Sequence, residues 1–439
     1  MRSEQQYIDL YETQRDLICR HSVPVLNDAR AAAFAAFSRQ GFPTQKVERY
    51  KYTDVAAAFA PDYGVNLARV NIPVNPREIF TCDVPNLSTQ TAYIVNDSPA
   101  FELTPFACSF AQAAKDCPHI LEQYYNRLAA TSDDAIAALN TMLAQDGLLV
   151  YVPRQQRMER PLQIVNILRS GVPTMVNRRV LIVLEEGADA TLLCCDHAMD
   201  NVDFLTTQVV EIFCGANARL DMYELEETHT LCRRFSNVYI HADRNANVSH
   251  NSITLYNGQT RNTTDVHLQG EYAEVTLNGC VVADKNQRVD NNTLIDHAVG
   301  HCTSHELYKY VVDDTAVGAF AGKILVRPDA QKTASTETNA NLCASPDARV
   351  YTQPMLEIYA DDVKCSHGST VGVLDEASLF YMRQRGIDEA EARMLLKFAF
   401  IGQVIDEIRL QPLRDRLHHL VEKRFRGELN KCTGCALCK

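Results

Sequence analysis

The sequence predicts a mainly β protein, in which a right-handed parallel β-helix is flanked by an N-terminal α-rich domain and a C-terminal helical domain. A weak repeat of 27–28 residues runs through the middle of the chain. Between Leu148 and Tyr359 no long stretch shows the 3.6-residue apolar period of a helix. Helical patterns occur before and after this region. We therefore expect four segments: residues 1–147, 148–374, 375–428 and a cysteine-rich tail at 429–439.

The repeat is centred on alanine. The first two copies read Gly187-Ala-Asp-Ala-Thr-Leu and Gly215-Ala-Asn-Ala-Arg-Leu. Successive copies place a small residue at Ala190, Ala218, Ala246 and Ala273. Such a period indicates one supersecondary unit stacked many times, with alanine where each coil turns tightly and Val, Leu and Ile in the inner stack. About six or seven coils fit between residues 187 and 372; the alternative is a β-sandwich with accidental Gly-Ala turns.

The N-terminal region carries helix and strand signals in turn. Asp28 can cap an alanine-rich helix at residues 29–40, which Gly41 would end. A second helix is expected at Asp133–Gln145. Strands are expected at Ala92–Val95, Leu148–Val152 and Leu162–Leu168.

Helical patterns return after Gly372. A short helix is expected at Asp375–Gln384, and a final helix from Pro412 to about Arg426. Between them, Asp388-Glu-Ala-Glu is a capping box that opens a longer helix. Its apolar stripe consists of Met394, Leu395, Phe398, Ile401, Ile405 and Ile408.

The composition excludes several classes of function. The chain has 43 Lys and Arg against 55 Asp and Glu, a net charge of −12, which disfavours a nucleic-acid-binding surface. No apolar run reaches the roughly 18 residues of a membrane helix, and no signal-peptide core begins the chain. We therefore expect a cytoplasmic protein that does not bind membranes. The 15 cysteines lie largely in apolar strands, which indicates packed, reduced thiols.

Cys365 and His367 form the most informative pair of side chains. They lie two residues apart in a strand-like segment, so both side chains should point to the same face. A thiolate and an imidazole on one face can bind a soft or borderline metal. From the residues alone, Cys365 can equally be a packed thiol, and the spacing by itself favours a surface histidine at His367. Gly368 would allow another backbone to approach closely.

Three other motifs do not predict chemistry. Gly318–Ile324 imitates a phosphate-binding loop, but it is one residue short and has Ile in place of the Ser/Thr that holds magnesium. His301-Cys-Thr-Ser-His305-Glu306 places Cys302 opposite the two histidines, so we expect a surface or lumen patch without metal. Asp361 and Asp362 point to opposite faces and predict a turn or an edge.

Three segments, in order, resemble the SufD family of iron–sulfur cluster assembly proteins. The first is Gly41-Phe-Pro-Thr-Gln-Lys-Val-Glu-Arg-Tyr-Lys-Tyr-Thr53, with Tyr50 where the family usually has Trp. The second comprises Phe320–Val326 and Gln331–Leu342. The third, Pro354–Gly368, is the most specific and is followed by Leu379–Ile387. The sister protein SufB shares the fold but has a different sequence in the third segment.

The resemblance implies a non-catalytic scaffold subunit. Proteins of this family pair with SufB through their β-helices and bind the ATPase SufC through their C-terminal helices; a homodimer is an alternative when the chain is alone. A nascent iron–sulfur cluster, shared with SufB, is thought to form where the scaffolds meet. SufB supplies a cysteine there and SufD a histidine that matches His367, with Cys365 as a second candidate ligand. We expect the ATPase-binding surface within Asp375–Ile408.

Two other classes of protein are alternatives to this one. A polysaccharide-active β-helix enzyme needs charged side chains clustered on one coil face and usually a secretion signal. A stand-alone electron carrier would use only the C-terminal cysteines and would leave the large scaffold unexplained.

The C-terminal tail departs from the family pattern. Cys432, Cys435 and Cys438 have the spacing of the first three ligands of a bacterial ferredoxin motif. Two-residue gaps allow successive thiolates to converge, and Gly434 eases the turn. A fourth ligand would come from a partner or solvent. We expect this tail to hold a labile iron–sulfur cluster, zinc or iron in transit; the alternative is free thiols on a loose terminus.

Anaerobic reconstitution with iron and sulfide tests the tail. The intact chain should gain metal and visible absorbance that a Cys432/Cys435/Cys438→Ser variant lacks, because three thiolates are removed together. Equal metal content and equal absorbance in the two proteins would discard a tail site.

Overall fold

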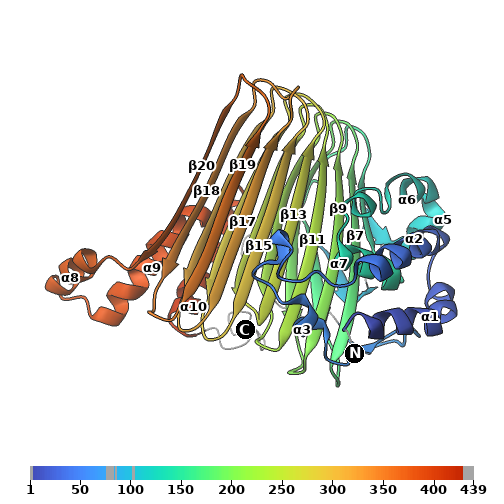
Figure 1. The fold of residues 1–439 in the computed structure, drawn as a ribbon, viewed down its shortest axis with the longest axis horizontal. Helices are drawn as coiled ribbons and strands as arrows, with labels where there is room; N and C mark the ends of the chain where they lie inside the picture. The colour runs from blue at the N-terminus through green and yellow to red at the C-terminus, as the bar shows by residue number, and fades with distance from the viewer. Residues whose placement is uncertain (1–2, 76–83, 85–86, 101–103, 429–439) are drawn as a thin grey trace.

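The protein is built around a solenoid of parallel strands (Figure 1). The computed structural model describes residues 3–75, 84, 87–100 and 104–428. Successive strands alternate between two sheets, so that each coil contributes one odd-numbered and one even-numbered strand. The parallel strands from β5 to β20, eight in each sheet, make eight turns, and the segment from β8 to β20 holds the six or seven predicted from its length. The β-helix prediction is confirmed, and the β-sandwich alternative is wrong.

The two sheets have long, regular strands. The odd-strand sheet contains β5 (Leu148–Val152), β7 (Thr174–Leu184), β9 (Phe204–Cys214), β11 (Cys232–Ala242), β13 (Gln259–Leu268), β15 (Arg288–His297), β17 (Val317–Val326) and β19 (Arg349–Ile358). The even-strand sheet contains β6 (Leu162–Leu168), β8 (Asp189–Ala198), β10 (Arg219–Glu227), β12 (Asn247–Tyr256), β14 (Glu274–Ala283), β16 (Thr303–Val312), β18 (Ala334–Cys343) and β20 (Lys364–Val373). The strands predicted at 148–152 and 162–168 are β5 and β6.

A left-handed turn residue followed by a small residue opens each even strand from β8 to β18. Positive φ angles occur at Gly187, Asn217, Asn245, Tyr272, His301 and Lys332. The next residue in each case is Ala188, Ala218, Ala246, Ala273, Cys302 or Thr333. The carbonyl of each small residue accepts a hydrogen bond from the first N–H of the next even strand. The Arg219 N–H, for example, donates to the Ala188 carbonyl at 2.8 Å. This column is the structural basis of the repeat.

The predicted column was wrong in its first copy, where the small residue at the turn is Ala188. Ala190 lies inside β8 opposite Leu220, whereas Ala188 is equivalent to Ala218. Gly187 and Asn217 both adopt the left-handed conformation, which glycine and asparagine tolerate best. Aligning glycine with glycine therefore missed the true register. Strand pairing joins Asp189 to Arg219 and Asn247 to Glu274, so successive coils differ in length.

The lumen, the space enclosed between the two sheets, is partly apolar and partly ionic. Its apolar part includes Val150, Leu192, Ile212 and Ile240. In the early coils several of these charges form ion pairs, whereas Glu226 accepts hydrogen bonds from the Thr254 and Thr260 hydroxyls. Arg178 and Arg234 bind Asp196 at 2.6 and 3.0 Å, and Arg234 also reaches Glu224 at 3.1 Å. His250 contacts the same Glu224 carboxylate at 2.9 Å. Buried charges need such partners because desolvation is costly.

Helices cover the outer face of the odd-strand sheet near its N-terminal end (Figure 1). They are α1 (Gln5–Arg20), α2 (Pro24–Gln40), α3 (Val55–Phe59), α5 (Phe110–Asp116), α6 (Pro118–Tyr124) and α7 (Ala135–Leu143). Asp134 caps α7 through Ile136 and Ala137, near the predicted start. The predicted start of α2 was wrong. It begins at Pro24, because proline fits the first helical position, and Asp28 lies inside the helix.

The N-terminal region also adds strands to both sheets. They are β1 (Gly64–Val65), β2 (Gln90–Val95), β3 (Ser98–Pro99) and β4 (Ala107–Ser109). The strand predicted at 92–95 is β2, which pairs in parallel with β6. The short β3 and β4 pair antiparallel with β2 and β5 and close this end of the solenoid.

Within the described residues, three helices follow the last strand: α8 (Glu376–Gln384), α9 (Glu389–Ile405) and α10 (Gln411–Phe425). Asp375 and Asp388 cap α8 and α9, as predicted. The apolar sides of α9 and α10 pack on the outer face of the even-strand sheet, against Tyr223, Ile253 and Cys280. No helix within the described residues is long and apolar enough to span a membrane.

Glu211 joins the N-terminal region to the solenoid. Its carboxylate pairs with Arg179 at 2.7 Å and accepts hydrogen bonds from the backbone N–H groups of Asn126, Leu128 and Ala129. The side chains of Glu211 and Arg179 are almost fully buried.

Replacing Glu211 by alanine should lower the free energy of unfolding by about 3–5 kcal/mol, because it leaves the Arg179 charge buried without its partner. The matched control is Glu186→Ala, which removes an exposed pair with Arg154 and should cost about 0–1 kcal/mol. Chemical denaturation measures both values. Similar losses in the two variants would contradict the structural role of Glu211.

Candidate functional site at the open end of the solenoid

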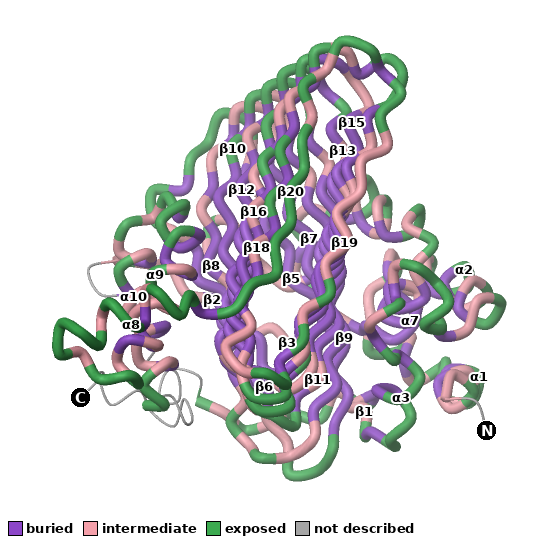
Figure 2. Tube along the Cα trace, turned by 60° about the vertical axis from the view of Figure 1, so that its left-hand side comes forward, coloured by how far each residue is buried: buried purple, intermediate pink, exposed green. Residues whose placement is uncertain are grey.

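The solenoid ends in an uncovered coil. β19 pairs only with β17, and β20 pairs only with β18, among the described strands. Figure 2 looks towards this end and shows β20 exposed along most of its length. The unpaired N–H and C=O groups of an edge strand are ready to pair with another strand. This end of the molecule therefore has the character of an interaction surface.

Exposed apolar side chains gather on the same coil. They are Tyr351, Ile358, Tyr359, Val371 and Val373. Val373 is 74% exposed, which is unusual for an aliphatic side chain on a regular strand. Several exposed apolar side chains on one terminal coil are consistent with a site of interaction.

Cys365 and His367 lie on β20 and point to the same face, as their spacing predicts. Cys365 pairs in register with Ser335, and His367 pairs with Glu337. This is the lumen face, because Cys365 packs against the apolar cluster that contains Ile324. Cys365 is half-buried and His367 is exposed.

The two side chains differ in their readiness to bind a metal. Burial raises the pKa of the Cys365 thiol, so its thiolate form is disfavoured. The His367 imidazole is accessible at the rim of the lumen. Within the described part of the chain, no three His, Cys, Asp or Glu side chains converge on one point. A metal at His367 would therefore take further ligands from outside this set. Cys432, Cys435 and Cys438 lie outside the described residues.

Glu337 and Glu306 lie directly beneath His367, one and two coils deeper. Sequence reasoning missed this column. Strand pairing joins Glu306 to Glu337 and Glu337 to His367. Both pairs are separated by more residues than the predicted repeat of 27–28. The predicted repeat therefore does not place the three side chains in register. The signal that could have found them is the position of each left-handed turn residue.

The phosphate-loop imitation, the histidine pair and the paired aspartates have structural roles. His301 is a left-handed turn residue that stacks on Tyr272. Lys323, within the loop-like Gly318–Ile324, lies on β17 and pairs with Glu357. Asp361 and Asp362 lie in the turn between β19 and β20, as expected.

The first segment of the family resemblance is docked on the outer face of the odd-strand sheet. Arg49 binds Asp265 at 2.5 Å, and the Thr53 hydroxyl donates to Asp290 at 2.6 Å. Tyr50 is buried, with the Arg261 guanidinium over its ring. This segment extends to the open end, since Tyr52 stacks on Tyr351 of β19 with ring centroids 4.7 Å apart. The segment therefore connects the N-terminal region to the last coil.

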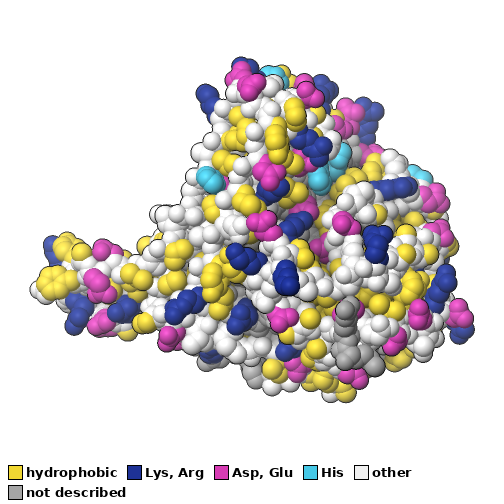
Figure 3. Space-filling model, in the orientation of Figure 1, with side chains coloured by type: hydrophobic (Ala, Val, Ile, Leu, Met, Phe, Trp, Pro, Cys, Tyr) yellow, Lys and Arg dark blue, Asp and Glu magenta, His cyan; other side chains and the backbone are white. Residues whose placement is uncertain are grey.

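Helix α8 protrudes beyond the solenoid and carries a second exposed apolar surface (Figure 3). Phe380 and Tyr381 are 65% and 60% exposed. By contrast, Met394, Ile401 and Ile405 of the predicted stripe on α9 are buried against the even-strand sheet and the neighbouring helices. The part of the C-terminal region that is free to bind a partner is therefore α8, and most of the α9 stripe serves packing.

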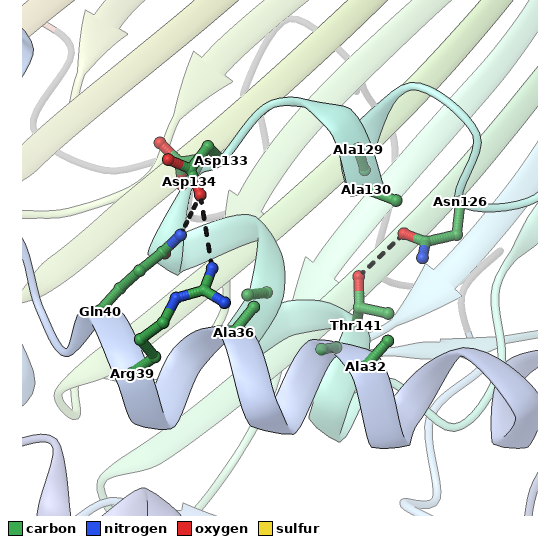
Figure 4. Close-up of a pocket in the computed structure, with 12 residues that line it drawn as sticks. Ala32, Ala36, Arg39, Gln40, Asn126, Ala129, Ala130, Asp133, Asp134 and Thr141 are labelled. Atoms are coloured by element: carbon green, nitrogen blue, oxygen red, sulfur yellow. Dashed lines mark hydrogen bonds and ion pairs between the residues drawn. The ribbon is translucent and has the colours of Figure 1, made fainter.

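The N-terminal region contains a small cavity, of about 140 Å³, between α2 and α7 (Figure 4). Alanines, including Ala32 and Ala36, form much of its wall. Its polar side chains contact one another: Thr141 donates to Asn126 at 3.3 Å. Ligand pockets are usually about 300–1,000 Å³. This cavity is a gap in a helix–helix contact made of small residues.

Comparison with protein families identifies the class to which this architecture belongs. Residues 166–400 match the SufBD core domain of the SUF system for iron–sulfur cluster assembly, and residues 1–164 match the SufBD N-terminal region. The chain belongs to the SufBD family of iron–sulfur cluster assembly proteins.

Individual relatives point to SufD within that family. The iron–sulfur cluster assembly protein SufD of Escherichia coli is 29% identical over 393 residues, which cover 89% of this chain and 90% of that protein. A SufBD family protein of Synechocystis is 27% identical over 417 residues, 91% of each chain. SufD of Bacillus subtilis is 25% identical over 322 residues, 72% of each chain. The predicted resemblance to SufD is confirmed, and none of these relatives supports a polysaccharide-active enzyme or an electron carrier.

Proposed function

We propose that this protein is a non-catalytic scaffold subunit on which a nascent iron–sulfur cluster forms. The observation that carries the proposal is the position of His367. It lies on the lumen face of the last strand, is exposed, and is surrounded by unpaired strand edges. The cluster is cargo that is assembled and passed on, and the chain needs no resident cofactor for this role.

The open end is the proposed interface with SufB. A second β-helix placed against β19 and β20 would cover the exposed apolar side chains and satisfy the strand edges. His367 would then face the partner, which would supply the missing ligands, including a cysteine. Neutral imidazole suits borderline metals such as iron. Cys365 is the second candidate ligand, at the cost of deprotonating a half-buried thiol. When the partner is absent, a second copy of this chain would cover the same edges.

The C-terminal helices are the proposed binding region for the ATPase SufC. We assign the contact to α8, because its aromatic side chains are exposed while α9 and α10 are anchored on the even-strand sheet. Closure of two ATPase subunits would pull on α8 of each scaffold and transmit the movement to the adjacent open end. Removing α9 and α10 would uncover the sheet, so point substitutions on α8 test this contact more cleanly than a deletion.

His367→Ala should abolish support for cluster-dependent enzymes in cells whose own scaffold gene is deleted. Its free energy of unfolding should change by less than about 0.5 kcal/mol, because the side chain is exposed. Enzyme activity, thermal unfolding and co-purification with SufB are measured together. Normal enzyme activity with normal complex formation would contradict a ligand role for His367.

Phe380→Ser/Tyr381→Ser should reduce co-purification of SufC, because exposed aromatic side chains supply much of the binding energy of an interface. The matched control is Tyr272→Asn, which replaces a 52% exposed aromatic on a solenoid turn with a residue that tolerates its positive φ. The control should bind SufC normally. Equal SufC binding by the α8 variant and the control would show that SufC does not bind through these α8 side chains.

A further inference from the structure

Two buried glutamates form a column with His367 along the inside of the even-strand sheet. Glu306 on β16 pairs in register with Glu337 on β18, which pairs with His367 on β20. Neighbouring strands lie about 4.8 Å apart, so each carboxylate is one strand spacing from the next member of the column. Glu306 is 2% exposed, Glu337 is 1% exposed, and His367 is open to solvent. The column thus runs from the surface into the lumen.

The neighbours of these glutamates show that both point into the lumen. On β16, Ser304 hydrogen-bonds His297 across the lumen at 2.9 Å, and Tyr308 packs on Phe320 of the opposite sheet. Glu306 lies between them and shares their face. Glu337 reaches the opposite sheet at Gly322, where an added Cβ atom would overlap its Oε1. The absence of a side chain at Gly322 makes room for this carboxylate.

Neither carboxylate has a positively charged partner. Among the described residues, no Lys, Arg or His donates to any of the four Oε atoms, and the Thr293 hydroxyl near Glu306 is a neutral group. The contrast with the early coils is direct, because Glu224 has both Arg234 and His250 as partners. A buried carboxylate without a partner carries a large desolvation cost. Two of them on adjacent coils are difficult to explain as packing alone.

The proton affinities of the three glutamates follow this difference. Burial raises the pKa of Glu224, but the hydrogen bond from His250 and the charge of Arg234 outweigh it and lower that pKa to about 2. Burial raises the pKa of Glu306 to about 7, with a smaller opposing effect from the nearby Thr293 hydroxyl. Burial, and then the charge of Glu306, raise the pKa of Glu337 to about 9. The environment of Glu306 and Glu337 therefore lacks a positive charge.

We propose that Glu306 and Glu337 bind one divalent cation inside the lumen, which it reaches from the open end past His367. Carboxylate oxygens suit hard and borderline divalent ions such as Mn²⁺ and Fe²⁺. An ion between two adjacent strands can contact one oxygen from each glutamate, and water completes its coordination. Binding releases the protons that these carboxyls hold to solvent, so the affinity should rise with pH. His367 lies one strand spacing beyond and provides a first contact at the mouth. The identification of the natural ion as Fe²⁺ rests on the proposed function; the existence of the site does not.

Mn²⁺ binding to the isolated full-length chain tests the site, because bound Mn²⁺ is counted directly by electron paramagnetic resonance. The parent carries Cys432/Cys435/Cys438→Ser, so the tail thiols cannot contribute. This parent protein should bind one Mn²⁺ per chain, and Fe²⁺ added under anaerobic conditions should displace it. Bound Mn²⁺ should also raise the midpoint temperature of thermal unfolding. Glu306→Gln/Glu337→Gln should lose both effects while keeping the circular dichroism of the parent.

The matched control is Glu357→Gln on β19, which removes a carboxylate of the same terminal coils that pairs with Lys323. It should keep the bound ion and the shift in thermal midpoint. The proposed site would be overturned if the parent bound no Mn²⁺ or if the double variant bound as much as the parent. Glu306 and Glu337 would then be buried, protonated carboxyls without a metal. The result is separable from the cellular assay of His367: a chain that binds Mn²⁺ through these glutamates but does not support cluster assembly keeps the site and refutes the proposed function.

Discussion

The hydrogen-bond ladder between successive coils is the constraint on which the rest of the structure depends. Each even strand from β8 to β18 presents its backbone to the next coil, and each new coil is positioned by a left-handed residue and the small residue after it. In a parallel sheet, the backbone N–H and C=O groups along one edge of a strand are hydrogen-bonded only when a neighbouring strand pairs with that edge. A solenoid therefore always has two ends at which this pattern must be stopped, covered or passed to another molecule.

The two ends of this solenoid are treated differently. At the N-terminal end, β3 and β4 run antiparallel to their neighbours, and α5 packs against β4. At the other end β19 and β20 have no further strand among the described residues, and their apolar side chains are exposed. The same end carries His367, and α8 protrudes beside it. The fold thus places its candidate ligand where its backbone is unsatisfied.

Sequence reasoning predicted the fold well because its signals are local and repeated. Alternating apolar residues, turn residues and helix caps act within a few positions, so β5, β6, α8 and the cap at Asp388 were located correctly. The register between coils was harder, since it depends on the length of every intervening turn. Gly187 was matched to Gly215 by residue type, although its structural equivalent is Asn217. His367 was found through its strand spacing and family resemblance, whereas Glu306 and Glu337 required the true register.

The distribution of charge inside the lumen follows from the position of each coil. In the early coils, a buried carboxylate can be reached from the opposite sheet by a long side chain such as Arg234, and Glu224 is held in its ionised form. Near the open end the facing positions are occupied by Thr293 and Gly322, which cannot supply a positive charge. Glu306 and Glu337 remain uncompensated in coils close to solvent. Their raised pKa values mean that these carboxyls hold protons near neutral pH, and a cation arriving through the open end would bind there by displacing those protons.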